Sequence, residues 1–92
     1  LPALRSLKLW GGGWFSLDGV RGLLASPLAD RLEHLAVMQQ TFGDPLAAAV
    51  ARASPLAGLR TLDLSDNNIT DAGAAALADS LYLSNLERLT LR

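Results

Sequence analysis

The 92-residue chain contains no cysteine, which removes disulfide bonds and thiolate metal sites from consideration. Aromatic residues are scarce, at 5% of the chain, while half of the residues are hydrophobic and most of these are leucine or alanine. That composition favours repeated helix and strand packing over one large aromatic core. The formal net charge of -1 gives no electrostatic basis for binding nucleic acid or an anionic membrane surface, so neither is predicted as a partner.

Long apolar runs are also missing, because no stretch approaches the roughly eighteen uninterrupted apolar residues that span a bilayer. The opening segment LPALRSLKLW lacks the charged start and small-residue cleavage site of a signal peptide. Together with the absence of cysteine, these features predict a cytoplasmic protein.

What the chain does contain is an internal repeat. The pattern L-x-x-L-x-L begins at Leu4, Leu32, Leu59 and Leu86, which are 28, 27 and 27 residues apart. The pentapeptide ASPLA occurs at 25–29 and again at 53–57, a spacing of 28. A fixed period of this length is the signature of repeat architectures, so residues 1–92 are predicted to form one array whose units begin near these leucines.

Each unit is predicted to consist of a strand, a turn and a helix. The L-x-L core alternates apolar and polar residues with period two, as a short half-buried strand does. A turn segment of five residues follows and ends on a large apolar residue, which is Trp14, Phe42 or Ile69 in the three units. These three side chains are therefore predicted to lie in the core.

Helices are predicted after the turns, each with an N-cap. Asp44 precedes a proline at the first helical position, where the missing N–H is no loss. Thr70 or Asp71 is expected to cap the helix over 72–81, and Ser16 or Asp18 the weaker helix over 20–25. Small residues dominate these helices, which fits close packing between neighbouring units.

The stretch LRTLDLSDNNI, with Gly73 and Leu77 after it, resembles the ribonuclease-inhibitor-like subclass of leucine-rich repeats. The resemblance implies an α/β fold: a right-handed solenoid, as a horseshoe segment, with short parallel strands on the concave face and helices on the convex face. It also implies protein partners on the concave face and no catalytic residue in the repeat. The alanine, leucine and arginine content and the repeated ASPLA suggest a bacterial protein.

The chain departs from the family pattern at the turn asparagine. Asn67 fits the position where the family side chain bonds the turn backbone, but Gly12 and Gln40 replace it in the other units. The ladder of asparagine side chains is therefore expected to be interrupted. The turn at 11–13, with three glycines, is expected to deviate most.

Solenoids cover their terminal apolar faces with polar capping repeats, and neither end of this sequence supplies one. We expect either a fragment of a longer array or self-association through the uncapped ends.

If the leucines point into the core, the alternating residues project from the concave sheet face. The predicted rows across the units are Ser6, His34, Thr61, Arg88; Lys8, Ala36, Asp63, Thr90; and Trp10, Met38, Ser65, Arg92. Exposed tryptophan and methionine are enriched at interfaces. The candidate partner-binding residues are therefore Trp10, Met38, Lys8, His34, Asp63 and Arg88, with Asp63 and Arg88 placed to pair. The alternative for Trp10 is that it folds over the glycine turn and covers local apolar surface.

No catalytic, metal-binding or cofactor-binding site is predicted. His34 is the sole histidine, and its neighbour Glu33 faces the other way on a strand. The sequence predicts a non-catalytic protein-interaction module and no enzyme. Two alternatives remain open: a regulatory module that acts on an enzyme partner, as GTPase-activating or sensor proteins do, and a structural spacer with no specific partner.

Overall fold

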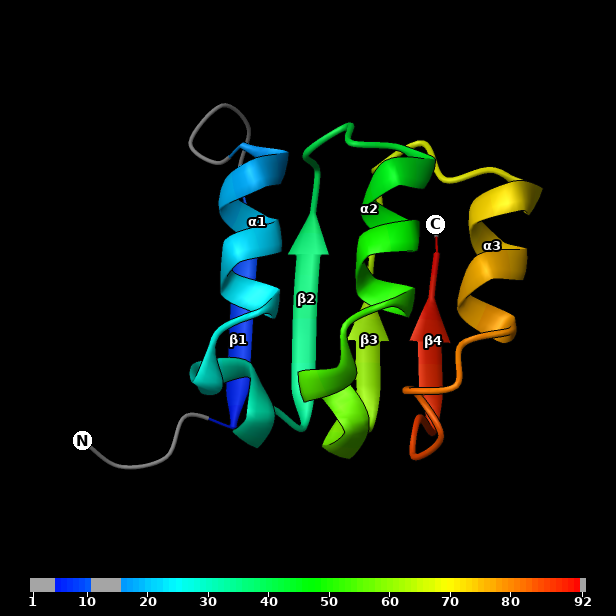
Figure 1. Ribbon diagram of the computed structural model, residues 1–92. Coiled ribbons are helices and arrows are strands. Elements are labelled where there is room, and N and C mark those ends of the chain that lie inside the picture. Colours follow the sequence, from blue (N-terminus) through cyan, green and yellow to red (C-terminus); the bar gives the residue numbers. More distant parts are fainter. Residues whose placement is uncertain (1–4, 11–15, 92) are drawn as a thin grey trace.

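The structure is a computed structural model that describes residues 5–10 and 16–91. Four parallel strands form one sheet in the order β1-β2-β3-β4, and a helix follows each of the first three strands (Figure 1). The strands are β1 Ser6–Trp10, β2 His34–Met38, β3 Thr61–Asp63 and β4 Arg88–Thr90. The α-helices are α1 Leu17–Leu24, α2 Asp44–Ala51 and α3 Asp71–Ala78, and the 3-10 helices are η1 Pro27–Arg31 and η2 Ser54–Gly58.

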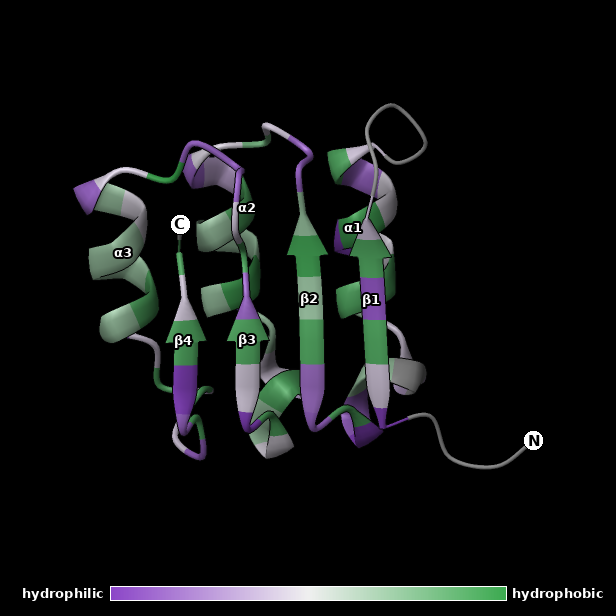
Figure 2. Ribbon diagram, turned by 180° about the vertical axis from the view of Figure 1, so that it is seen from behind, coloured by the Kyte–Doolittle hydropathy of each residue, from purple (hydrophilic) through white to green (hydrophobic). Residues whose placement is uncertain are grey.

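The molecule has two layers. All three α-helices cover one face of the sheet, and η1 and η2 lie near the amino ends of the strands (Figure 1). No helix of the described residues lies on the opposite face of the sheet, and all four strands are seen directly from that side (Figure 2). We call it the open face. Alternating short strands and helices in one parallel sheet agree with the predicted α/β class. Over the described part of the chain, every helix is too short or too polar to cross a membrane.

The strands pair as the repeat predicts. Leu35 of β2 lies opposite Leu7 of β1 and Leu62 of β3, and every other pair keeps the same phase. The apolar positions of the two central strands, Leu35, Val37 and Leu62, are almost completely buried, and so is Leu64 directly after β3. Because side chains alternate between the two faces of a strand, the polar positions face away from the helices. The core therefore lies between the sheet and the helix layer.

The turns after β2 and β3 repeat their backbone shape although their sequences differ. Positive φ angles occur at Gln39 and Thr41 after β2, and at Asp66 and Asn68 after β3. Each pair stands 27 residues from its counterpart. Such φ angles are uncommon outside glycine, so their recurrence marks one shared turn. The first turn, at 11–13, lies outside the described residues, so the expectation of its deviation stays a prediction.

The residues predicted to lie in the core at the turn ends pack against it, but they are less buried than the core leucines. Phe42 and Ile69 are partly buried and lie against the core. Trp14, the third member of this set, lies outside the described residues.

The predicted helix caps are confirmed in two helices and wrong in the third. The Ser16 hydroxyl accepts a hydrogen bond from the Gly19 N–H at 3.0 Å, and the Thr70 hydroxyl accepts one from the Ala72 N–H at 3.3 Å. The N-cap of α2 is Gly43, with φ 72°, and Asp44 is already inside the helix. The Asp44 carboxylate instead accepts hydrogen bonds from Thr70 in the next unit. Asp44 therefore does not cap its own helix, because its carboxylate binds the hydroxyl and N–H of Thr70 in the next unit.

Candidate functional site

The open face gathers the predicted partner-binding residues in rows. Strand pairing places Ser6, His34, Thr61 and Arg88 side by side, and does the same for Lys8, Ala36, Asp63 and Thr90. Trp10 lies opposite Met38 in a third row. Neighbouring strands are about 4.8 Å apart, so side chains in one row are lateral neighbours. The predicted rows are confirmed for every residue that stands in a described strand, whereas Arg92 lies outside the described residues.

Trp10 is the most exposed aromatic side chain on this face, with 61% of its surface accessible. The Lys8 ammonium lies 6.0 Å from the centre of its ring, at the outer limit of a cation–π contact. Met38 is half-buried beside it. An exposed indole flanked by a methionine and a cation forms an apolar corner of the open face, which we call the Trp10 corner.

The His34 side chain is hydrogen-bonded to Thr61, its neighbour in the same row. Its Nδ1 lies 2.7 Å from the Thr61 hydroxyl. Glu33, the adjacent carboxylate, forms ion pairs with Arg5 and Arg60 at the amino ends of the strands and does not reach the imidazole. Within residues 5–10 and 16–91, no three histidine or acidic side chains gather closely enough to hold a metal ion. His34 therefore presents a hydrogen-bonded surface imidazole.

The predicted pair of Asp63 and Arg88 is not formed. Asp63 accepts hydrogen bonds from the Ser65 N–H at 3.0 Å and from the Ser65 hydroxyl. Strand pairing also places Thr90, and not Arg88, opposite Asp63. Among the described residues, Arg88 has no carboxylate within ion-pair distance. Asp63 is thus hydrogen-bonded within its own turn, and among the described residues the Arg88 guanidinium forms no ion pair on the open face.

Asn67 bonds the backbone of its own turn, as the resemblance implied, and also connects two neighbouring units. Its side chain is fully buried, and its amide nitrogen donates to the carbonyl of Val37 at 2.6 Å, as well as to two carbonyls of its own turn. Its Oδ1 accepts from the Gln40 N–H at 3.2 Å. The Gln40 side chain, at the equivalent position, donates to the Met38 carbonyl at 3.0 Å. Gln40 therefore still binds its own turn, so the predicted interruption is not complete there; Gly12 lies outside the described residues.

A row of alternating charges at the amino ends of the strands was not predicted. Each strand is immediately preceded by a charged residue, and these are Arg5, Glu33, Arg60 and Glu87. Their side chains pair in sequence at 3.4, 3.7 and 3.7 Å. Each exposed pair contributes about 0 to 1 kcal/mol, but the alternation favours this strand order over a shifted one. The signal was present in the sequence, since the four residues occupy one repeat phase.

Residues 59–78 match the protein family described as Leucine Rich repeat. This span contains β3 and the whole of α3. Comparisons with curated proteins and with solved structures give no match. The matched segment is the unit whose sequence shows the repeat pattern most clearly, and a leucine-rich repeat favours a role in protein interaction.

Proposed function

We propose that the chain is a non-catalytic protein-interaction module that binds a protein partner through the open face. In this proposal the units form a right-handed solenoid of the ribonuclease-inhibitor-like subclass, and the open face is its concave side. The unit length of 27 or 28 residues with one helix in each unit supports the subclass. A bacterial origin and a cytoplasmic location belong to the same proposal and rest on the composition alone.

The observation that carries this proposal is the exposed Trp10 corner on a sheet face that no helix covers. Tryptophan and arginine dominate the binding energy of many interfaces, because they combine a large contact area with directed polar groups. Trp10 and Arg88 stand on the two outer strands, with β2 and β3 and the hydrogen-bonded pair of His34 and Thr61 between these strands. A sheet fixes the positions of all these side chains, so a partner would meet a preorganised surface.

Arg88 and Lys8 give the described open face a positive bias, because their two positive charges face the single negative charge of Asp63, which forms no ion pair with either of them. A partner surface with an apolar centre and acidic residues at its rim would complement it. Charges at the rim mainly raise the association rate, and the buried aromatic group supplies most of the affinity.

The test is affinity capture from lysate of the source organism, with Trp10→Ala and Arg88→Glu as baits beside the unmodified chain. Tyr82→Ala is the matched control, because Tyr82 is an exposed aromatic residue outside the open face. Leu62→Ala serves as a folding control, with an expected loss of about 2 to 5 kcal/mol of stability from its buried site. A protein recovered by the unmodified chain and Tyr82→Ala, and lost from both open-face variants, would support the proposal.

The other outcomes separate the remaining functions. Equal recovery by all folded baits would move the binding site elsewhere and support a spacer. An enzyme among the captured proteins, with altered activity on addition of the chain, would support the regulatory function.

Self-association is tested in the same experiment. Leu89 has 38% of its surface exposed, while Leu62, its counterpart in the neighbouring strand, has 1%. The exposed Leu81 and Tyr82 also precede β4 in the chain. Recovery of an untagged copy by the unmodified bait, and its loss with a separate Leu81→Ala bait, is the result expected if this surface pairs with a second copy.

A further inference from the structure

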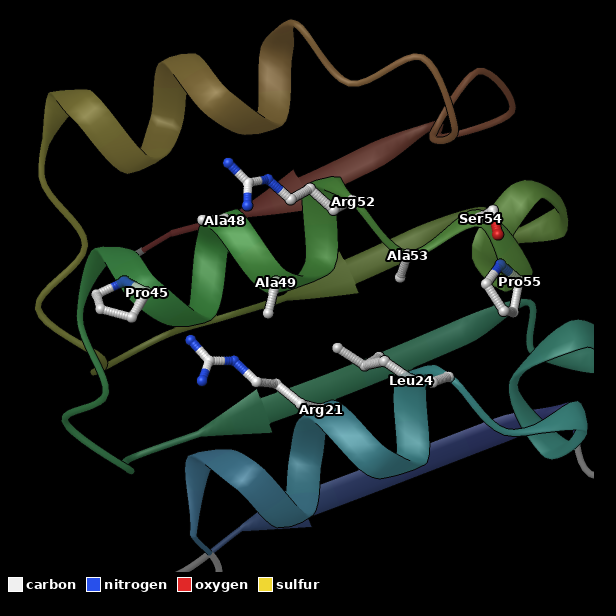
Figure 3. Close-up of a pocket in the computed structure, with 10 residues that line it drawn as sticks. Arg21, Leu24, Pro45, Ala48, Ala49, Arg52, Ala53, Ser54 and Pro55 are labelled. Carbon is white, nitrogen blue, oxygen red and sulfur yellow. The ribbon is translucent and has the colours of Figure 1, made fainter.

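A groove of about 470 Å³ runs between α1 and α2 on the helix side of the molecule (Figure 3). It lies on the opposite side of the sheet from the open face. Most of its lining is apolar and small, and two arginines border it. The lining residues are Arg21, Leu24, Ala25, Pro45, Ala48, Ala49, Arg52, Ala53, Ser54 and Pro55.

The groove exists because α1 and α2 lack the contacts that draw α2 and α3 together. Gly73 lets α3 approach α2 closely, since a Cβ atom there would lie 2.7 Å from Cγ2 of Ile69 and 3.1 Å from Cβ of Ala47. The residue 27 positions before Gly73 is Leu46, a fully buried side chain.

The polar link between the helices is absent as well. Asp44 of α2 accepts hydrogen bonds from Thr70 at 2.8 and 2.6 Å. At the corresponding positions of the first pair of helices stand Leu17 and Gly43, which cannot form such a link. The space between these two helices therefore stays open as a groove.

The groove has a cationic end and an apolar end. Figure 3 shows both guanidinium groups extending toward the end marked by Pro45, that of Arg21 in the space between α1 and α2 and that of Arg52 on the side of α2 toward α3, whereas Leu24 and Pro55 lie toward the other end. The separation of charge from apolar surface along one groove fits a ligand with a charged head and an apolar tail.

Both arginines have guanidinium N–H groups that form no ion pair with a described residue. Arg52 forms no ion pair with any described residue. Arg21 uses one nitrogen for Asp18 at 3.4 Å, and the carboxylate of that pair is almost fully exposed. Such pairs are weak and are readily exchanged for a better acceptor. A guanidinium group binds a carboxylate through two parallel N–H···O bonds, which makes a carboxylate the matching head group.

We propose that the groove between α1 and α2 binds an aliphatic carboxylate, with the head group held by Arg21, the charge of Arg52 adding to the positive potential at that end, and the chain lying over Leu24, Ala49 and Ala53. Its volume falls within the range of about 300 to 1,000 Å³ that small-molecule sites occupy. This site lies on the helix side and is independent of the open face. A test of this proposal therefore does not test the protein-interaction function.

The second large hollow gives a useful contrast. It has about 660 Å³ and is lined by Arg5, Arg31, Glu33, Gly58, Arg60, Asn85 and Glu87. Its acidic side chains already pair with Arg5 and Arg60, and its surface is mainly polar. It offers neither an apolar floor nor a separated cationic end.

The experiment is a titration of the ¹⁵N-labelled chain with decanoate, below its micelle-forming concentration, followed by amide chemical shifts. Decanol provides the same tail without the charge, and acetate provides the charge without the tail. The variant is the double substitution Arg21→Gln and Arg52→Gln, and Arg31→Gln is the matched control because Arg31 lies outside the groove. The dispersion of the amide signals reports whether each variant is folded.

The expected result is a saturable shift of amides in α1 and α2, a loss of affinity on the order of tenfold in the double variant, and no change in Arg31→Gln. Decanol and acetate should each bind more weakly than decanoate. Filling the floor with Ala49→Leu should also weaken decanoate in a chain that stays folded. Shifts that do not saturate, that centre on other residues, or that are equal for decanoate and decanol would each overturn the proposal.

Discussion

The junction between α2 and α3 is closed, whereas the junction between α1 and α2 leaves a groove. Both join units of nearly the same length, and the strands beneath them pair in the same register. The difference lies in a few side chains: Gly73 and the Asp44–Thr70 link at the closed junction, and Leu46 with Gly43 at the open one. The strand layer of this protein is uniform, and its helix layer is not.

This contrast has a physical basis. Strands are joined by backbone hydrogen bonds, which every residue except proline supplies, so their spacing is constant. Helices pack through side chains, and the interaxial distance depends on which side chains stand at the contact. A repeat can therefore keep its strand register while its helix spacing, and any site between the helices, changes from unit to unit.

The largest loss of stability is expected from a substitution at Asn67, in the turn that is hydrogen-bonded to the preceding unit at the closed junction. Asn67→Ala removes the hydrogen bonds that its amide nitrogen donates to the carbonyls of Val37, Leu64 and Ser65 in a fully buried site, and the bond that its Oδ1 accepts from the Gln40 N–H. Buried polar groups without partners cost about 1 to 3 kcal/mol each, so we expect a loss near the upper end, about 3 kcal/mol.

Urea denaturation measures this loss, with Asn85→Ala as the matched control. Asn85 also donates across units, to the carbonyl of Ala57 at 2.8 Å, but it is exposed. Its replacement should cost about 0.5 to 1 kcal/mol. Equal losses for the two asparagines would contradict the role assigned to burial at Asn67.

The sharpest test of the comparison is one substitution made in two helices. Gly73→Ala should lower stability by about 1 to 3 kcal/mol, because the new methyl group meets Ile69 of its own unit and Ala47 across the closed junction. Gly22→Ala is the control at an exposed helix position and should raise stability by about 0.5 to 1 kcal/mol, because a helix-interior alanine is favoured and the space around it is empty. Thermal and urea unfolding of both variants measures the two changes, and effects of the same sign would contradict the close approach of α3 to α2 at Gly73.

The smallest effect is a pH dependence confined to the closed junction. The Thr70 hydroxyl, and then the Thr70 N–H, donate to Asp44 and hold the pKa of that carboxyl below its ordinary value of 3.8. A lowered pKa in the folded state favours the ionised form. The resulting stability is present above pH 3.8 and is lost as the pH falls through the pKa of the folded chain.

Asp44→Asn isolates this contribution, because the asparagine does not titrate. The melting temperature of the variant should lie below that of the unmodified chain at neutral pH, and the gap should narrow as the pH falls below 3.8. The other carboxylates are common to both chains and cancel in the comparison. A gap that stays constant with pH would argue against the ionised Asp44–Thr70 link.

Much of the open face could be predicted from sequence. The period-two alternation assigns each strand residue to a face, and the constant repeat length brings equivalent residues into one row. That is why Trp10 and Met38, or His34 and Thr61, could be placed together before any contact was seen. The predicted Asp63–Arg88 pair was wrong because residues one row apart are diagonal neighbours, and a closer donor, Ser65, took the aspartate.

The sequence by itself determined which segments form strands, the phase in which they align and that a turn follows each of them, because each depends on residues close together in the chain or on the fixed repeat length. It narrowed the caps of α1 and α3 to two residues each, among which the structure shows Ser16 and Thr70, and it placed Met38 in a turn although this residue ends β2. Only the tertiary structure decided that Asp44 serves the next unit and that the first two helices stand apart. Those outcomes depend on side chains from two units meeting in space, where the size of one residue, glycine or leucine, sets how closely the helices approach.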